Sequence, residues 1–419
     1  MRPMIDWPLG MVTTDQPPRV RDLFPSRANG QRVLPSFSLT ERDRRYARVR
    51  ERMQAEGMDC LIAAPGEPFE PQASSRYLTQ IGGLQGAAWA ILPLDGQATA
   101  ILSSEREHRM WSKHLEWPQD LRWGSPMDLL IGRLKELGVK RVGVVGLAGV
   151  HHRPDGIIPY TTWIKIEAAL PRVSWLHASE LLDRCRVVKG EEEIAVIQRI
   201  AIADEAAIQR MVEVARPGLD ETDLWLEISE VLTRATGDWP ARLSLGSNDL
   251  PSNTSNTMAL PVEIEDGSIV SQEIDARLQG YRAQCNHSIL VGSRGADAYR
   301  DSMQRAVEVF EHLVDWLRPG VTVGQFLAEY EWAATRRRGV AGSVVMHTCG
   351  LGSDKPRVGV GGQANSVDWV IEPGWTFTIK THFRQADTRV ATQVGEPVTV
   401  TDTGARRLGR RDLVPIITG

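Results

Sequence analysis

DGSIVSQEIDARLQGYRAQCNHSILVG, residues 266–292, decides the fold of this 419-residue chain. A β-branched pair, Ile269-Val270, lies near its start, and a second apolar run, Ile289–Val291, lies near its end. Polar residues and the turn-forming pair Gly280-Tyr281 separate the two runs. Short β-branched runs on either side of a glycine-containing turn predict two paired strands. We therefore expect a strand pair with a short polar connection, and Glu273 at the end of its first strand.

The second half of the chain contains an internal repeat. Residues 207–237 and residues 302–339 both read as a helix, an Arg-Pro-Gly break and a second helix. Apolar residues recur at helical spacing before Pro217 and before Pro319, and a proline followed by glycine ends a helix. In the first copy, the second helix is expected to begin near Asp220. Two helical pairs, each followed by strand-rich sequence, predict a pseudo-symmetric α+β domain.

The sequence before this repeat alternates between helical and strand patterns, which predicts an α/β domain. Helices are expected at residues 41–56, 128–137 and 161–170, strands at residues 60–63, 141–145 and 173–176, and a hairpin at residues 89–102. Residues 1–38 are rich in proline, arginine and aspartate and show little periodicity, so we expect an extended N-terminal arm. The two domains are expected at residues 39–188 and 189–419.

The composition is that of a globular chain with room for two domains, with 42% hydrophobic and 24% charged residues. A net charge of −4 gives no indication of a nucleic-acid partner. No apolar stretch approaches the roughly 20 residues of a membrane span, so no membrane association is expected. The four cysteines show neither zinc-binding nor redox spacing, which favours a reducing compartment and a cytoplasmic location.

Further motifs follow the opening segment in the second half of the chain. They are the turn Cys349-Gly350-Leu351-Gly352, the run from Pro373 to Lys380, and the strand end at residues 400–404. Together with residues 266–292 they resemble the pita-bread superfamily of creatinase, prolidase and aminopeptidase P. The resemblance implies a C-terminal pita-bread domain preceded by a creatinase-type N-terminal α/β domain. It also implies a homodimer that takes a small-molecule substrate.

In this superfamily the same motifs supply the ligands of a dinuclear metal centre. Here those positions hold Glu273, Gln284, Cys349, Lys380 and either Gly395 or, with a one-residue slip, Glu396. A glutamine is a neutral and weaker ligand, and a lysine repels a metal ion. Two divalent ions about 3.5–4 Å apart need several carboxylates to offset their mutual repulsion. We therefore expect no dinuclear metal and no cofactor.

The metal-free members of the superfamily suggest the chemistry, because the run Gln272-Glu273-Ile274-Asp275 resembles ectoine hydrolase and the missing ligands resemble creatinase. This implies metal-independent hydrolysis of a small non-peptide C–N bond, of the amidine, guanidino, urea or cyclic amide type. Glu273 is the expected general base and Lys380 the acid or electrostatic stabiliser. Asp275, on the same strand face as Glu273, would orient it. The alternatives are a structural salt bridge for the pair and a turn-capping role for Asp275.

His347 and Cys349 are further catalytic candidates, because a cysteine beside a histidine can form a thiolate nucleophile. The alternative is a small buried cysteine that only fills space. The candidates for substrate binding are Gln284, Asn256, His287, Arg357 and Trp89. Of these, the resemblance places Asn256 near the general-base histidine of creatinase, and Trp89 near the creatinase dimer interface. A structural hydrogen bond is the alternative for His287, and a place in the core is the alternative for Trp89.

Two other functions compete with the hydrolase. One is a mononuclear-metal lyase or Xaa-Pro-type peptidase, with a single ion on Glu273, Asp275 and Glu396. The other is a non-catalytic binding protein whose functional surface lies elsewhere. Replacement of metal ligands by glutamate, lysine and glutamine indicates a polar cavity rather than a filled one, which favours an enzyme.

Overall fold

The computed structural model describes residues 27–28, 31–32, 36–66, 73–82, 88–147, 156–247, 261–335, 340–352, 354–359, 364–385 and 390–419. These form two compact units. The N-terminal unit contains the described residues up to Glu192 together with the segment Leu351–Lys355. The C-terminal unit contains Glu193–Gly350 and Pro356–Gly419. Most of the predicted N-terminal arm lies outside the described residues.

The N-terminal unit is built on a six-stranded sheet with the order β6-β5-β4-β3-β7-β8. Its strands are β3 (Cys60–Ala63), β4 (Trp89–Pro93), β5 (Thr99–Leu102), β6 (Asp120–Trp123), β7 (Arg141–Val145) and β8 (Ser174–His177). Strands β4 and β5 are antiparallel, which confirms the predicted hairpin, and β3 and β7 are parallel. The central strands are buried throughout, as expected for a sheet with helices packed against it.

Six helices accompany this sheet in the described part of the N-terminal unit. They are α2 (Leu39–Ala55), α3 (Ala73–Thr79), α4 (Glu105–His114), α5 (Pro126–Leu137), α6 (Tyr160–Ala169) and α7 (Ser179–Arg186). Ser38 caps α2 by accepting a hydrogen bond from the backbone N–H of Glu41. The predicted helices and strands are thus confirmed to within a few residues, and the class of this unit is α/β.

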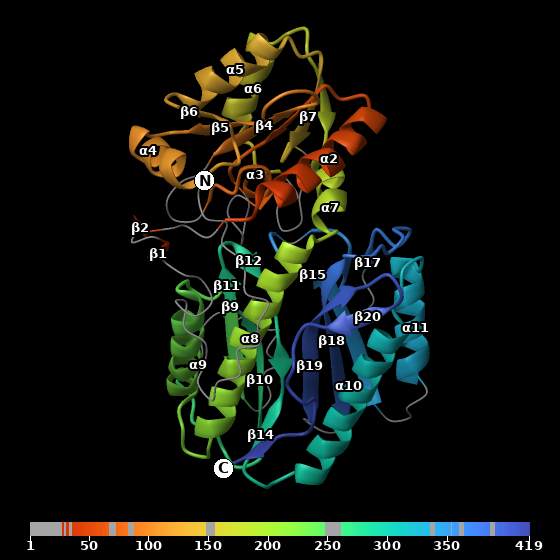
Figure 1. Ribbon diagram of the computed structural model, residues 1–419. Coiled ribbons are helices and arrows are strands. Elements are labelled where there is room, and N and C mark those ends of the chain that lie inside the picture. The colour runs from red at the N-terminus through yellow and green to blue at the C-terminus, as the bar shows by residue number, and fades with distance from the viewer. Residues whose placement is uncertain are drawn as a thin grey trace. The chain divides into compact units, whose positions relative to one another are not determined.

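The C-terminal unit has two helical pairs, which confirm the internal repeat (Figure 1). The first pair is α8 (Glu191–Val214) and α9 (Glu221–Thr236), and the second is α10 (Ala296–Trp316) and α11 (Val323–Thr335). The first helix of each pair ends just before its Arg-Pro-Gly break. Helix α9 begins next to Asp220, as predicted, and Asp220 is its N-cap. In Figure 1, α8 and α10 cross in front of the strands, and α9 and α11 lie at the two sides of the unit.

Two sheets lie between these helices. The first has the order β21-β14-β10-β9, with β9 (Arg242–Gly246), β10 (Ser268–Asp275), β14 (Ile289–Val291) and β21 (Ile417–Thr418). The second has the order β13-β19-β18-β15-β16-β17, with β20 (Ala405–Arg407) also paired to β19. Its strands are β13 (Asn286–His287), β15 (Val340–Thr348), β16 (Arg357–Val358), β17 (Ala364–Asn365), β18 (Thr376–Gln385) and β19 (Ala391–Val400). Helix α10 packs on β18 and β19, so this unit has the predicted α+β class.

Residues 266–292 form the predicted strand pair, because β10 and β14 are antiparallel with Ser268 opposite Val291. The predicted short connection is wrong. It contains a second hairpin of β11 (Arg277–Leu278) and β12 (Tyr281–Arg282), whose turn residues Gln279 and Gly280 have φ angles of 55° and 79°. Two positive φ angles in succession are typical of a tight hairpin turn. The chain then enters the other sheet as β13, so this segment links the two sheets.

Among the described residues, no helix is both long and apolar enough to cross a membrane. All four cysteines are buried and are not joined in disulfides.

Candidate functional site

The centre of the site is an ion pair between the two sheets of the C-terminal unit. Lys380 on β18 donates from Nζ to Glu273 Oε1 on β10 at 2.8 Å, and to Gln284 Oε1 at 3.1 Å. Glu273 is 4% exposed and Lys380 is 5% exposed, so both charged groups are largely removed from water. A charge that is buried in this way is stable only when an opposite charge or a full set of hydrogen bonds accompanies it.

A second cation shares the Glu273 carboxylate. Arg242 Nε on β9 lies 2.8 Å from Glu273 Oε2, an ion-pair distance without the angles of a hydrogen bond. Burial raises the pKa of Glu273, but the charges of Lys380 and Arg242 outweigh this effect and lower the pKa to about 2. Burial lowers the pKa of Lys380, and Glu273 opposes this effect. Glu273 therefore stays ionised, and it is the anion that keeps the lysine charged.

Gln284 connects this pair to His347 on β15. His347 Nε2 lies 3.0 Å from Gln284 Oε1, and Nδ1 lies 3.2 Å from the carbonyl oxygen of Thr348. Burial lowers the pKa of His347 well below its usual value, and the positive charges of Lys380 and Arg282 lower it further. A neutral imidazole carries one N–H, so the ring donates to only one of these two oxygens.

Asp275 and Cys349 have partners of their own. Asp275 is buried and forms a salt bridge with Arg282 on β12. The Cys349 Sγ atom lies 3.0 Å from Thr378 Oγ1, in a buried contact that fits a small cysteine between two strands. Cys349 thus contacts a hydroxyl group, whereas the His347 ring contacts the side-chain amide of Gln284.

The sheet register decides between Gly395 and Glu396. Lys380 is directly opposite Gly395, whereas Glu396 is opposite Ile379. Successive residues of a strand point to opposite faces, so Glu396 faces away from Lys380. Arg411 binds Glu396 there, with 2.7 Å between Nη2 and Oε1. Glu396 therefore does not face Glu273 across Lys380, as the predicted single ion on Glu273, Asp275 and Glu396 would require.

The other predicted residues lie in different places. His287 is fully buried, and its ring contacts the Val414 carbonyl oxygen at 2.9 Å and the Arg411 guanidinium, which fits a structural role. Trp89 is 8% exposed within β4 of the N-terminal unit, where it belongs to the hydrophobic core. Arg357 on β16 is directly opposite His347. Asn256 lies outside the described residues.

Sequence reasoning missed Arg242, Arg282 and His382. His382 is two residues after Lys380 on β18, so both side chains are on one face of the strand. Its Nε2 atom is buried and has no hydrogen-bond partner among the described residues. Burial lowers the pKa of His382 to about 4, helped by the charge of Lys380. The two-residue spacing between Lys380 and His382 would have identified His382 from the sequence, because residues two apart on a strand share a face.

The donor set does not fit the metal centre that the superfamily resemblance implies. Among the described residues, no group of three histidine, cysteine, aspartate or glutamate side chains could hold an ion. Glu273 is already bound by two cations, Gln284 is neutral, and Lys380 places an ammonium group where a ligand is expected. A metal ion at the Glu273 carboxylate would lie beside two positive charges.

Known proteins with a creatinase-type N-terminal domain and a pita-bread C-terminal domain are similar to this chain. Residues 45–188 match the family model described as the creatinase/prolidase N-terminal domain, and residues 195–402 match metallopeptidase family M24. An Xaa-Pro dipeptidase structure from Bacillus anthracis superposes with a TM-score of 0.75, and the match covers 90% of this chain and 99% of that chain at 19% identity.

The chain belongs to the pita-bread superfamily of creatinase, prolidase and aminopeptidase P.

Two curated members of the superfamily are similar over most of their length. An uncharacterized hydrolase/peptidase, y4tM of Sinorhizobium fredii, is 24% identical over 309 residues, which cover 68% of this chain and 74% of that protein. An uncharacterized peptidase, YqhT of Bacillus subtilis, is 20% identical over 337 residues, which cover 80% of this chain and 90% of that protein. Hydrolysis of a non-peptide C–N bond, predicted from the creatinase and ectoine hydrolase resemblance, is therefore wrong, because these relatives are peptidases.

Gly395 provides the space for the Lys380 side chain. A Cβ atom at position 395 would lie 2.6 Å from Lys380 Cγ and 3.0 Å from Asn286 Oδ1. We expect Gly395→Ala to lower the free energy of unfolding by about 1–3 kcal/mol, measured by urea denaturation. The loss should be smaller in a Lys380→Ala background, because that change removes Cγ. Gly132→Ala in α5, where nothing lies within 4 Å of a new Cβ, should instead stabilise by up to about 1 kcal/mol. Equal losses in both backgrounds would show that Gly395 has another role.

Loss of the Glu273 carboxylate should strongly destabilise the pita-bread fold. We expect Glu273→Gln to lower the free energy of unfolding at pH 7 by roughly 3 kcal/mol, because Lys380 would stay buried without its anion. The double variant Glu273→Gln/Lys380→Met should lose less than the sum of its single changes. The exposed pair of Arg300 and Asp297 is the control, since Asp297→Asn should change stability by less than about 0.5 kcal/mol. Additive losses in the double variant would contradict a coupled pair.

The buried Nε2 atom of His382 has no hydrogen-bond partner among the described residues, and this histidine should make stability depend on pH. The pKa of His382 falls from 6.5 to about 4 in the folded chain, so below pH 6.5 the unfolded chain binds a proton that the folded chain does not. Stability is then fully present above about pH 6.5 and falls as the pH approaches 4, by about 1.4 kcal/mol for each unit of pKa difference. We expect His382→Gln to reduce this fall in denaturation curves between pH 7 and 4. The other buried histidines are the same in both proteins, so identical pH profiles would refute the assignment to His382.

Proposed function

We propose that this chain is a peptide-binding member of the superfamily, whose C-terminal unit takes short peptides of the Xaa-Pro type at the Glu273–Lys380 pair. The observation that carries this proposal is the buried Lys380 ammonium bonded to Glu273 and Gln284, at a position where the superfamily has a metal ligand. The ligand class comes from the Xaa-Pro dipeptidase and peptidase relatives.

The site offers the groups that a peptide needs. Lys380 and Arg242 are donors for a carbonyl oxygen or a terminal carboxylate, and Glu273 is an acceptor for an N–H or an ammonium group. Because the pKa of Glu273 is about 2, this acceptor is ionised across the physiological pH range. A peptide would bind to these groups in the charge states that they already have. No metal ion would be needed.

Cleavage of Xaa-Pro peptides is the second candidate. It is favoured by the match of residues 195–402 to a metallopeptidase family and by the names of the relatives. The residues of the site do not supply the metal on which that chemistry depends, so we derive no step through one.

The two candidates are separated by binding and product measurements on one preparation. Full-length protein purified without chelators is titrated with Ala-Pro and Gly-Pro by calorimetry, and its metal content is measured by elemental mass spectrometry. The same peptides are incubated with the protein, with and without added manganese, cobalt or zinc, and products are measured by chromatography. We expect saturable binding with less than about one-tenth equivalent of metal and no free proline.

Metal-dependent release of proline would overturn the binding proposal in favour of the peptidase. Absence of binding to every peptide would contradict both. Lys380→Met, with its fold checked by circular dichroism, should weaken peptide binding at least about tenfold, because it removes the buried donor. The homodimer and the cytoplasmic location stay predictions, the first of which light scattering of the purified chain would test.

A further inference from the structure

Ser244 on β9 lies beside the Glu273–Lys380 pair. It is directly opposite Glu273 in the antiparallel pairing of β9 with β10. Side chains of directly opposite residues share a face of the sheet, with their Cβ atoms about 4.5–5.5 Å apart. Arg242, two residues before Ser244 on the same strand, contacts Glu273 at 2.8 Å on this face. The Ser244 hydroxyl therefore points to the side of the sheet on which the ion pair lies.

The hydroxyl group of Ser244 is buried without a hydrogen bond. Ser244 is 1% exposed, and its Oγ atom has no hydrogen-bond partner in the part of the chain that the structure describes. A buried polar atom without a partner destabilises the folded protein, because it has lost its hydrogen bonds to water. By contrast, the hydroxyl of Ser271 on β10 is bonded to Ser288 Oγ at 2.8 Å. A ligand is the partner that would complete Ser244 in a site of this kind.

The Lys380 ammonium group has one unused donor. An ammonium group carries three N–H bonds. Glu273 Oε1 accepts one of them at 2.8 Å and Gln284 Oε1 accepts another at 3.1 Å. No other side chain or carbonyl oxygen of the described residues accepts the third.

Two acceptors that lie near Lys380 do not take this third N–H. One is Asn286 Oδ1, since this atom and Lys380 Cγ both lie within 3.0 Å of the point where a Cβ atom of Gly395 would be. The other is Nε2 of His382, two residues after Lys380 on the same face of β18. Both atoms are buried and have no hydrogen-bond partner in the described ranges. The third N–H of Lys380 and the hydroxyl of Ser244 are thus two buried donors beside one carboxylate.

A carbonyl oxygen fits these two donors. Its two lone pairs accept two hydrogen bonds, and it is neutral. A carboxylate fits less well, because Glu273 is already bonded to Lys380 there and would repel a second negative charge. Burial of a charge also costs more than burial of a neutral carbonyl group. Arg242, whose side chain is 36% exposed, remains the donor for the terminal carboxylate of a ligand.

We propose that Ser244 is a further ligand-binding residue, whose hydroxyl holds the peptide-bond carbonyl oxygen of the ligand together with the third N–H of Lys380. The proposal rests on the proposed function, because a bound peptide supplies this carbonyl group. It assigns Ser244 no part in bond cleavage. A serine nucleophile needs a base in hydrogen-bond contact with its hydroxyl, and no described residue makes such a contact.

The test changes the hydroxyl and the carbonyl oxygen separately. The full-length protein and its Ser244→Ala variant are titrated by calorimetry with Ala-Pro and with its thioxo analogue, in which sulfur replaces the peptide-bond oxygen. We expect Ser244→Ala to weaken binding of Ala-Pro about three- to tenfold, because one hydrogen bond is lost. Binding of the analogue should change less than about twofold, since sulfur is a weak acceptor.

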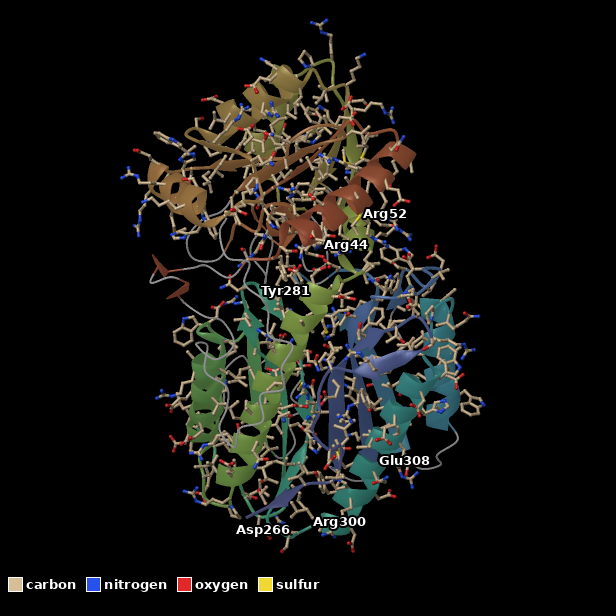
Figure 2. The ribbon with its side chains drawn as sticks, in the orientation of Figure 1. Arg44, Arg52, Asp266, Tyr281, Arg300 and Glu308 are labelled. Carbon is tan, nitrogen blue, oxygen red and sulfur yellow. The ribbon has the colours of Figure 1, made fainter. Side chains whose placement is uncertain are left out.

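Stability measurements separate a ligand contact from a structural role. Ser244→Ala should not lower the midpoint of thermal unfolding, because no hydrogen bond within the protein is lost. Ser302→Ala on α10 is the matched control, since Ser302 is equally buried and its Oγ atom is bonded to Thr392 Oγ1 at 2.8 Å. This control should lower the midpoint and leave both affinities unchanged. Figure 2 shows Arg300, which is on α10 close to Ser302, and Tyr281, which follows β10, at opposite ends of the C-terminal unit.

The outcomes separate this inference from the proposed function. Equal effects of Ser244→Ala on Ala-Pro and its thioxo analogue would overturn the inference and leave peptide binding intact. An effect on Ala-Pro that is absent for Ala-Pro amide would show that the hydroxyl binds the terminal carboxylate, which also contradicts the inference. A fall in the unfolding midpoint as large as that of Ser302→Ala would indicate a structural partner for Ser244. Failure of the unaltered protein to bind Ala-Pro would instead refute the proposed function.

Discussion

The buried contact between the Lys380 ammonium and the Glu273 carboxylate is the interaction on which the C-terminal unit depends, because it joins strands of two different sheets. A lysine that is only 5% exposed needs an anion in contact with its ammonium group. Glu273 supplies that anion and is held ionised by Lys380 and Arg242 together. The neighbouring His347 and His382 rings are neutral, because burial and, to a smaller extent, the charge of Lys380 lower the pKa of each.

The backbone makes room for this arrangement at Gly395. A side chain there would overlap Lys380, which stands directly opposite in the sheet. The next residue, Glu396, faces the other way and is neutralised by Arg411. Alternation along β19 thus turns Glu396 away from Lys380, the partner of Glu273. Because Glu273 and Glu396 each have their own cationic partners, these two acids do not converge on one point, as a metal centre requires.

The sequence predicted the fold better than the site, for a physical reason. Helices and strands follow from local periodicity, so the repeat of α8–α9 in α10–α11 and the alternation of the N-terminal unit could be read directly. The contact of Lys380 with Glu273 was reached only through a resemblance, because the two residues are 107 positions apart. Arg242 comes from a third strand, and its contact depends on how β9 pairs with β10. The connection after Asp275 was misjudged because a chain that changes sheets has no periodic signal.

The superfamily indicates a peptidase, whereas the site residues do not fit the metal ion of a metallopeptidase. The charges around Glu273 account for this difference. A fold carries many functions, so the peptidase relatives make peptides a reasonable ligand without making this chain a metallopeptidase. A metal ion entering the site would have to displace Lys380 and Arg242 from Glu273, which would leave the buried Lys380 ammonium without its anion and beside a new cation. The carboxylate of the proposed peptide would instead meet cations that are already in place. The substitutions that make this site poor for a metal ion are therefore the ones on which the peptide-binding proposal rests.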